Sequence, residues 1–263
     1  RGNKAVEVET IIRDLPDFSG HNHPLTHFIF DHQNNLIVNV GAPSDQCKDD
    51  KREVFCSEIN TSLKTHAAVR RYPYNVLTKQ WSHNYEVIAS GLRNSMALAS
   101  HSSGTLLQAE NSIDLEELER PFEEINRIDI GGFFGWPYCY DNDKVNRIWP
   151  THGGKICADP EQHKQPWILM PAHAAPLDMR YYSGEMFPEL EGSLLVSWHG
   201  YRRTGRRLVS YSVDNLGLPL RRSPASYNID PEVKRSGEDD EESGTTEFNK
   251  NHFPVSVTNT AQA

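Results

Sequence analysis

The chain has 263 residues, a mass of 29.9 kDa and a formal net charge of −9. This acidic balance argues against a surface that binds nucleic acid by neutralising phosphates, and no apolar run is long enough to cross a membrane. Because all-β folds of this length are commonly single units, we expect one domain. The sequence opens with Arg1 rather than Met and carries no signal peptide, which favours a mature product or a fragment.

The apolar segments are short and strand-like, and turn-forming Gly, Asn, Asp, Ser and Pro separate them. In chain order, the expected strands are 28–30, 36–40, 85–88, 106–107, 194–196 and 208–213. One short acidic segment, 114–119, is a plausible helix or alternatively a loop turn. From about residue 221 onward, including the acidic run 238–242, the composition predicts an irregular or disordered tail.

A strand–turn–strand theme recurs at 28–41, 97–111 and 188–200. Its spacing is too unequal for a strict repeat, but it fits sheet modules separated by inserted loops. We therefore predict an all-β fold, a β-propeller, in which radial repetition protects most sheet edges.

The four cysteines fall into two local pairs, Cys47 with Cys56 and Cys139 with Cys157. No Cys-x-x-Cys spacing suggests zinc, so two short-loop disulfides are the favoured prediction. Asn60-Thr61-Ser62 is an acceptor triplet for N-glycosylation. Together these features favour an oxidising, extracellular setting for a secreted glycoprotein.

The segment 91–111 places Arg93 and Asn94 just before a predicted hairpin. Cationic and amide groups therefore gather at one rim of a sheet, an arrangement suited to an anionic ligand.

Four groups of motifs in series give the chain a resemblance to soluble PQQ-dependent sugar dehydrogenases of the glucose and sorbosone dehydrogenase group, above all to fungal PQQ-dependent pyranose dehydrogenase. The motifs are 20–26 followed by Phe30-Asp31, then 91–94, then Glu123-Glu124-Ile125-Asn126 with Gly135-Trp136-Pro137, and finally 197–203. The resemblance implies a six-bladed propeller with the cofactor over the central channel. About four blades are represented, so we expect a fragment with a partial propeller over 1–220 and the tail over 221–263.

Oxidising a sugar hydroxyl needs a base for the O–H proton and an acceptor for the hydride, which no side chain provides, so a cofactor is required. By resemblance, His21, ten positions before Asp31, is the general base, with His23 as its rival. Arg93 would face the quinone oxygens of PQQ and stabilise developing negative charge, and Asn94 would donate a second hydrogen bond.

Further site residues follow from the same resemblance. The calcium ion would bind backbone carbonyls of Ser112 and Ile113, and Glu124 is either a ligand of a second calcium or an ordinary carboxylate. Trp136 is expected to be structural. The remaining candidates are Arg202 and Arg203 for the cofactor carboxylates, His173 beside the cofactor or the sugar, and Trp198 and His199 beside the sugar.

The leading hypothesis is a PQQ- and calcium-dependent enzyme that oxidises a pyranose at its anomeric carbon to a lactone. Electrons would then pass to a haem b cytochrome domain or another acceptor. The alternatives are a non-catalytic propeller binding module and an inactive fragment. A binding module has no need for both His21 and Arg93, so that pair favours the enzyme.

Overall fold

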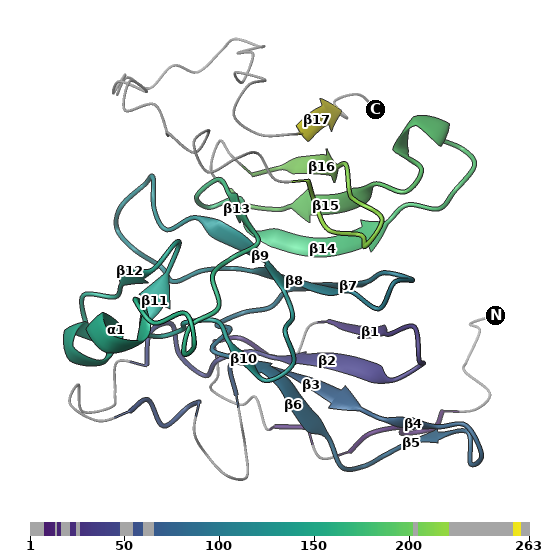
Figure 1. Ribbon diagram of the computed structural model, residues 1–263, viewed down its shortest axis with the longest axis horizontal. Helices are drawn as coiled ribbons and strands as arrows, with labels where there is room; N and C mark the ends of the chain where they lie inside the picture. Colours follow the sequence, from purple (N-terminus) through teal and green to yellow (C-terminus); the bar gives the residue numbers. More distant parts are fainter. Residues whose placement is uncertain are drawn as a thin grey trace, which may run out of the picture.

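Three four-stranded antiparallel units, stacked one above another, form the body of the protein (Figure 1). The computed structural model describes residues 8–13, 15–16, 22–24, 27–47, 55–59, 66–201, 205–220 and the backbone of 255–258. Each unit is a meander of the kind that forms one blade of a β-propeller. The fold is therefore all-β, with three blades among the described residues where about four were predicted.

The blades follow one another along the chain. Blade 1 contains β1 (Phe28–Phe30), β2 (Leu36–Val40), β3 (Ala68–Tyr72) and β6 (Glu86–Ser90), and β10 (Gly132–Phe133) adds to β6 in parallel. Blade 2 contains β7 (Ala97–Ser100), β8 (Leu106–Glu110), β9 (Glu123–Arg127) and β13 (Ile168–Met170). Blade 3 contains β14 (Pro176–Tyr181), β15 (Leu194–Trp198), β16 (Arg207–Tyr211) and β17 (Val255–Thr258).

Smaller elements decorate the blades. They are the hairpins β4 (Tyr74–Asn75) with β5 (Gln80–Trp81) and β11 (Cys139–Tyr140) with β12 (Lys144–Val145), the helix α1 (Pro150–Ile156) and a 3₁₀ turn at Pro188–Leu190. Among the described residues, no helix is both long and apolar enough to span a bilayer.

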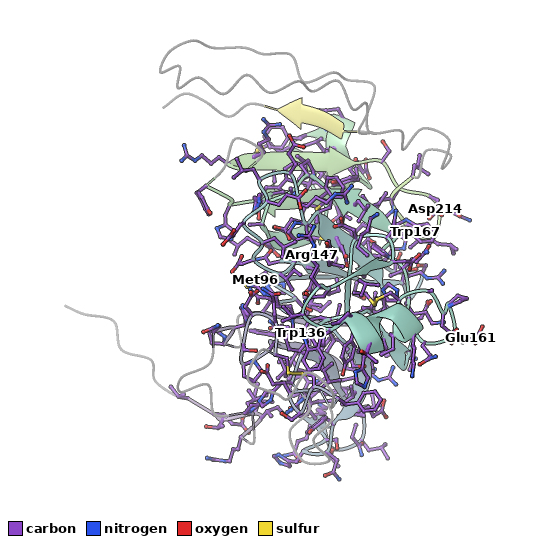
Figure 2. All side chains as sticks on the ribbon, turned by 90° about the vertical axis from the view of Figure 1, so that its left-hand side faces the viewer. Met96, Trp136, Arg147, Glu161, Trp167 and Asp214 are labelled. Atoms are coloured by element: carbon purple, nitrogen blue, oxygen red, sulfur yellow. A yellow bond between two sulfur atoms is a disulfide. The ribbon has the colours of Figure 1, made fainter. Side chains whose placement is uncertain are left out.

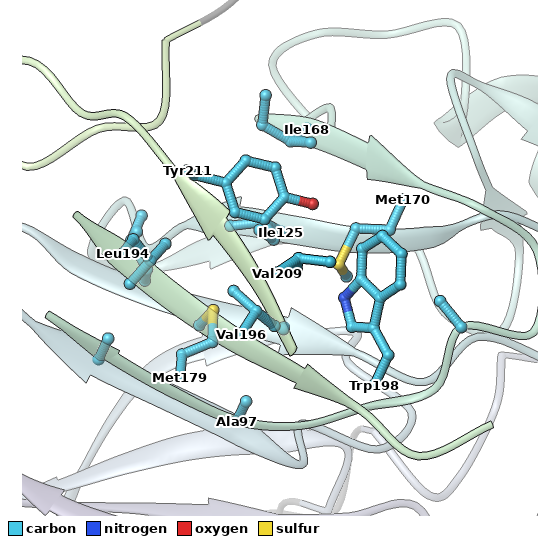
Figure 3. Packing of buried hydrophobic residues seen from close by; sticks show 14 of the residues in the cluster. Ala97, Ile125, Ile168, Met170, Met179, Leu194, Val196, Trp198, Val209 and Tyr211 are labelled. Carbon is cyan, nitrogen blue, oxygen red and sulfur yellow. The ribbon is translucent and has the colours of Figure 1, made fainter. Parts of the chain in front are cut away.

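The period-2 alternation of strand side chains explains the core between the blades. On β7, Ala97 and Ala99 point into the cluster shared with blade 3, whereas Leu98 points into the cluster shared with blade 1. Small alanines let the inner strands β7 and β14 approach closely, and Met179 and Val196 fill the space beside them (Figure 3).

Of the two alternatives for segment 114–119, the structure shows the loop turn, because its side chains are almost all exposed and offer no apolar face to bury; among the described residues, α1 is the one α-helix. Two structural expectations need correction. The 188–200 theme is not a hairpin: its first half is the 3₁₀ turn, and β15 pairs instead with β14. Residues 255–258, inside the expected irregular tail, pair with β16 as the fourth strand of blade 3.

The loops that carry the predicted site meet at one end of the blades, because β1, β7 and β14 all begin there and β2, β8 and β15 all end there. We call this the site end; it comprises residues 22–24, 41–47, 91–96, 111–122, 171–175 and 199–201. The segment that follows β9 reaches the same end, where the indole Nε1 of Trp136 donates to the Asp45 carbonyl at 2.8 Å. Trp136 is therefore structural, as predicted.

Candidate functional site

Arg93 is the centre of the site end. Its side chain is only 7% exposed, and its Nε lies 2.9 Å from Asp45 Oδ1 while NH2 lies 3.0 Å from Asp114 Oδ2. NH1 donates to the Asn111 carbonyl at 3.0 Å, and the Arg93 carbonyl accepts from the Ala42 amide at 2.7 Å. One guanidinium therefore ties the loop after β2 to the loop after β8, and its nitrogens are directed at protein oxygens.

His23 is the described histidine beside Arg93. Its Nδ1 lies 2.7 Å from the Ala42 carbonyl, and because a carbonyl only accepts, the ring proton sits on Nδ1 and Nε2 keeps a lone pair. Burial, and then the positive charge of Arg93, lower the pKa of His23 from 6.5 to about 4. The ring is therefore neutral at physiological pH. His21 lies outside the described residues.

Gly41 explains why His23 sits where it does. A Cβ on Gly41 would lie 2.5 Å from the His23 carbonyl oxygen and 2.6 Å from its Cβ, so only glycine lets the two segments pack. The close approach holds His23 against the start of the loop that carries Asp45.

Three buried glutamates from β8 and β9 surround the other side of Arg93. Glu110 and Glu124 are opposite each other in the strand register, and Glu123 precedes Glu124. Burial raises the pKa of Glu110 to about 7 and that of Glu123 to about 8, and it raises the pKa of Glu124 well above its usual value. Arg93 opposes the shift at Glu110 and Glu123 but does not cancel it.

Their hydrogen bonds differ in kind. Glu110 accepts from the Asn94 amide at 2.9 Å and from the Gln108 side chain at 2.7 Å. Glu123 accepts from the Ser112 amide at 2.7 Å and from the Ala175 amide at 3.3 Å. A cavity of about 10 Å³ lies beside Arg93, Glu110 and Glu124 and has room for about one water molecule.

Unpartnered oxygens mark the same region. Asn94 Oδ1, Ser95 Oγ and Asn111 Oδ1 are buried and have no hydrogen-bond partner within the part of the chain that the structure describes. Amide oxygens among carboxylates suit a hard cation such as calcium, although no cluster of three His, Cys, Asp or Glu side chains with metal-binding geometry occurs among the described residues. The donor set thus fits a calcium ion held mainly by amide and backbone oxygens.

The fit to PQQ depends on Arg93. A quinone with three carboxylates needs cationic partners. The guanidinium of Arg93, however, already forms ion pairs with the carboxylates of Asp45 and Asp114. The Asp114 side chain is 81% exposed, so it is free to turn away into water. Such a movement would free NH2 of Arg93 for an anionic group.

Some of the other predicted site residues lie at the site end, and others lie outside the described residues. Ser112 and Ile113 follow β8 at the site end, with Ile113 buried. His173 lies in the loop before β14, where its Nε2 is 3.3 Å from the Glu117 carbonyl. Arg202 and Arg203 lie outside the described residues, as does the Asn60-Thr61-Ser62 triplet. Both predicted disulfides, Cys47–Cys56 and Cys139–Cys157, are present.

Trp198 does not fit the role of a sugar-stacking residue. Its side chain points into the core between blades 2 and 3, near Met170, and it is 4% exposed (Figure 3). Strand alternation turns it inward, whereas the next residue, His199, is exposed at the site end. Of this pair, only His199 is available to a ligand.

The sequence gives little sign that Asp45, Asp114, Glu110 and Glu123 belong to the site. The only local clue was a charged residue closing an otherwise apolar strand, as Glu110 closes β8. Asp45 is far from Arg93 in sequence, and nothing local indicates that pairing. Figure 2 views this end of the molecule, with Met96 and Trp136 labelled.

Comparison with known proteins identifies the family. The sequence profile described as Glucose / Sorbosone dehydrogenase matches residues 1–203. The chain belongs to this family. An uncharacterized protein of Borreliella burgdorferi is 28% identical over 191 residues, which cover 71% of this chain and 44% of that protein.

Two solved structures share the fold. The iodide structure of a Trichoderma reesei enzyme of Carbohydrate-Active Enzymes Family AA12 superposes with a TM-score of 0.57 at 20% identity, over 77% of this chain and 56% of that one. A structure named glucose dehydrogenase superposes with a TM-score of 0.50 at 18% identity, over 74% and 51%. The chain thus spans about half the length of the relatives it matches.

Proposed function

We propose that the chain is part of a PQQ- and calcium-dependent dehydrogenase that oxidises a pyranose at the anomeric carbon to a lactone. Its partial propeller domain would comprise residues 1–220 together with the strand 255–258. The observation that carries the proposal is that His23, two residues from the proposed base His21, lies beside Arg93 at one end of the blades. Family membership and the motif series support it.

PQQ, when bound, supplies the hydride acceptor, and calcium supplies a Lewis acid at the reacting carbonyl. Arg93 and Asn94 would hold the cofactor's anionic edge, Arg202 and Arg203 its carboxylates, and the Ser112 and Ile113 carbonyls the calcium ion. His173 and His199 would border the sugar.

The proton acceptor in this proposal is His21. His23 is a poor base because burial and the positive charge of Arg93 lower its pKa to about 4. Its packing on Gly41 suits an anchor that presents His21 to the sugar hydroxyl.

The setting we propose is extracellular, which agrees with the two disulfides. The electron acceptor would be a haem b cytochrome domain or a soluble partner. A non-catalytic binding module remains the alternative function of a different class.

The test uses the full-length parent protein with PQQ and calcium, and measures dye reduction driven by sugar. His21→Ala is expected to keep PQQ binding but lower turnover by about 10²–10⁴-fold, the usual contribution of a general base. His23→Ala is the matched comparison and should act through stability. Binding of PQQ without any sugar-dependent reduction by the parent protein would favour the binding module instead.

A further inference from the structure

Glu123 joins two blades at the site end. Its side chain starts β9 in blade 2, and Oε2 accepts from the amide of Ser112 in its own blade at 2.7 Å. Oε1 accepts from the amide of Ala175 at 3.3 Å, in the loop that leads into β14 of blade 3. The residue is only 6% exposed. Burying a carboxyl group is unfavourable unless its hydrogen bonds compensate for the lost contact with water.

Neither of the other buried glutamates makes such a connection. Glu110 binds Asn94 and Gln108 in the loop before blade 2 and in β8, and Glu124 binds the side chain of Asn126 on its own strand. Glu123 is thus the one of the three whose hydrogen bonds cross from blade 2 to blade 3.

The loop that it reaches is strained. His173 and Ala175 both have left-handed backbone conformations, with φ of 58° and 49°, which non-glycine residues adopt only when their surroundings hold them. The end of β15 also binds this loop. The amides of His199 and Gly200 donate to the carbonyls of Ala175 and Ala174, both at 3.0 Å. This loop is therefore clamped between Glu123 on one side and the end of β15 on the other.

The two loops carry different parts of the proposed cofactor site. Ser112 is one of the two residues expected to present carbonyls to calcium, and Ala175 is two residues from His173. A connection through one carboxylate sets the distance between these groups, which otherwise belong to separate blades. Precise spacing of this kind decides how well a site is preorganised.

We infer that Glu123 is a positioning residue, whose carboxylate clamps the Ser112 loop to the His173 loop and so fixes the geometry of the site across two blades. The structural part stands on the hydrogen bonds alone. The assignment of the two loops to cofactor binding rests on the proposed function.

The test is amide hydrogen exchange on the protein without cofactor, comparing wild type with Glu123→Gln and Glu123→Asp. In Glu123→Gln, one of the two amides faces an NH₂ group and loses its acceptor, so exchange at Ser112 or Ala175 should rise about tenfold, as expected for one lost hydrogen bond. Glu123→Asp keeps the carboxyl group but shortens its reach, so the longer bond to Ala175 should be released while Ser112 stays protected.

The matched control is Glu110→Gln, which alters a neighbouring buried carboxyl but should leave Ala175 exchange unchanged. Leu107 in β8 reports whether a variant has unfolded more widely. Unchanged exchange at both Ser112 and Ala175 in Glu123→Gln and Glu123→Asp would overturn the clamp.

Kinetics on the full-length protein separate the clamp from the proposed function. If wild type oxidises sugar, Glu123→Gln should lower kcat and weaken calcium binding, with a smaller change in the KM for sugar. If wild type does not turn over but the exchange changes appear, the clamp stands and the proposed function fails. If wild type turns over and the exchange does not change, the function stands and the clamp fails.

Discussion

His23 should make the protein sensitive to acid in a pH range that most folded proteins tolerate. Its pKa is about 4 in the folded protein, against 6.5 for an exposed histidine. When folding lowers the pKa of a histidine, protonation of that histidine lowers the free energy of unfolding of the protein. The stability that neutral His23 allows is therefore present above pH 6.5 and is lost progressively as the pH falls from 6.5 to about 4.

The magnitude follows from that difference. At about 1.4 kcal/mol for each pH unit, a pKa of about 4 instead of 6.5 corresponds to about 3 kcal/mol at the acid end. Glutamine at this position does not titrate and has an NH₂ group for the Ala42 carbonyl. The difference in free energy of unfolding, His23→Gln minus wild type, should therefore rise by up to about 3 kcal/mol as the pH falls from 7.5 to 4.

Urea unfolding at half-unit steps of pH, on wild type and His23→Gln, measures this difference directly, because every other titrating group is common to both proteins. His83→Gln, at an exposed position away from the site end, is the control for the exchange of histidine for glutamine. A wild-type-minus-variant difference that stays flat from pH 7.5 to pH 4 would refute the burial of a neutral imidazole at this position.

Two further predictions concern the same end of the blades. Burial holds the pKa of Glu124 well above its usual value, so the contribution of this group to the free energy of unfolding should fall as the pH rises. Without calcium, Glu124→Gln, which does not titrate, should therefore gain stability relative to wild type between pH 4.5 and pH 8, and an equal difference at both pH values in urea unfolding would contradict this. Gly41→Ala places a Cβ 2.5 Å from the His23 carbonyl oxygen and should destabilise the protein by about 1–3 kcal/mol in thermal unfolding, the usual effect of overpacking. Gly154→Ala in α1, which meets no atom within 4 Å, is its control and should be neutral or stabilising.

The sequence predicted the strands whose apolar character is plain, and it failed where burial depends on a distant partner. β1 and β2 were predicted with their exact bounds, 28–30 and 36–40. β3 was missed because it contains Arg70 and Arg71, yet Arg70 is buried with its guanidinium 4.0 Å from the ring centre of Tyr85. An arginine stacked on an aromatic ring can be buried stably, but the residues next to Arg70 in the sequence do not indicate that it will find such a ring.

The candidate site divides in the same way. Motifs in series single out Arg93 and the His21–His23 segment, but not Asp45, whose carboxylate meets Arg93 from the distant loop after β2. Trp198 illustrates the opposite error, since an aromatic beside His199 was assigned to the sugar and strand alternation buries it in the core.

By itself, then, the amino-acid sequence determined the all-β class, the two disulfide pairs and the family, because these depend on residue types and spacings that are readable along the chain. Only the tertiary structure decided which groups face one another at the site end: Arg93 with Asp45 and Asp114, and Glu123 with Ser112 and Ala175. The physical reason is that a propeller brings together loops from successive blades, and the energy of each pairing depends on burial that exists only once the blades have packed.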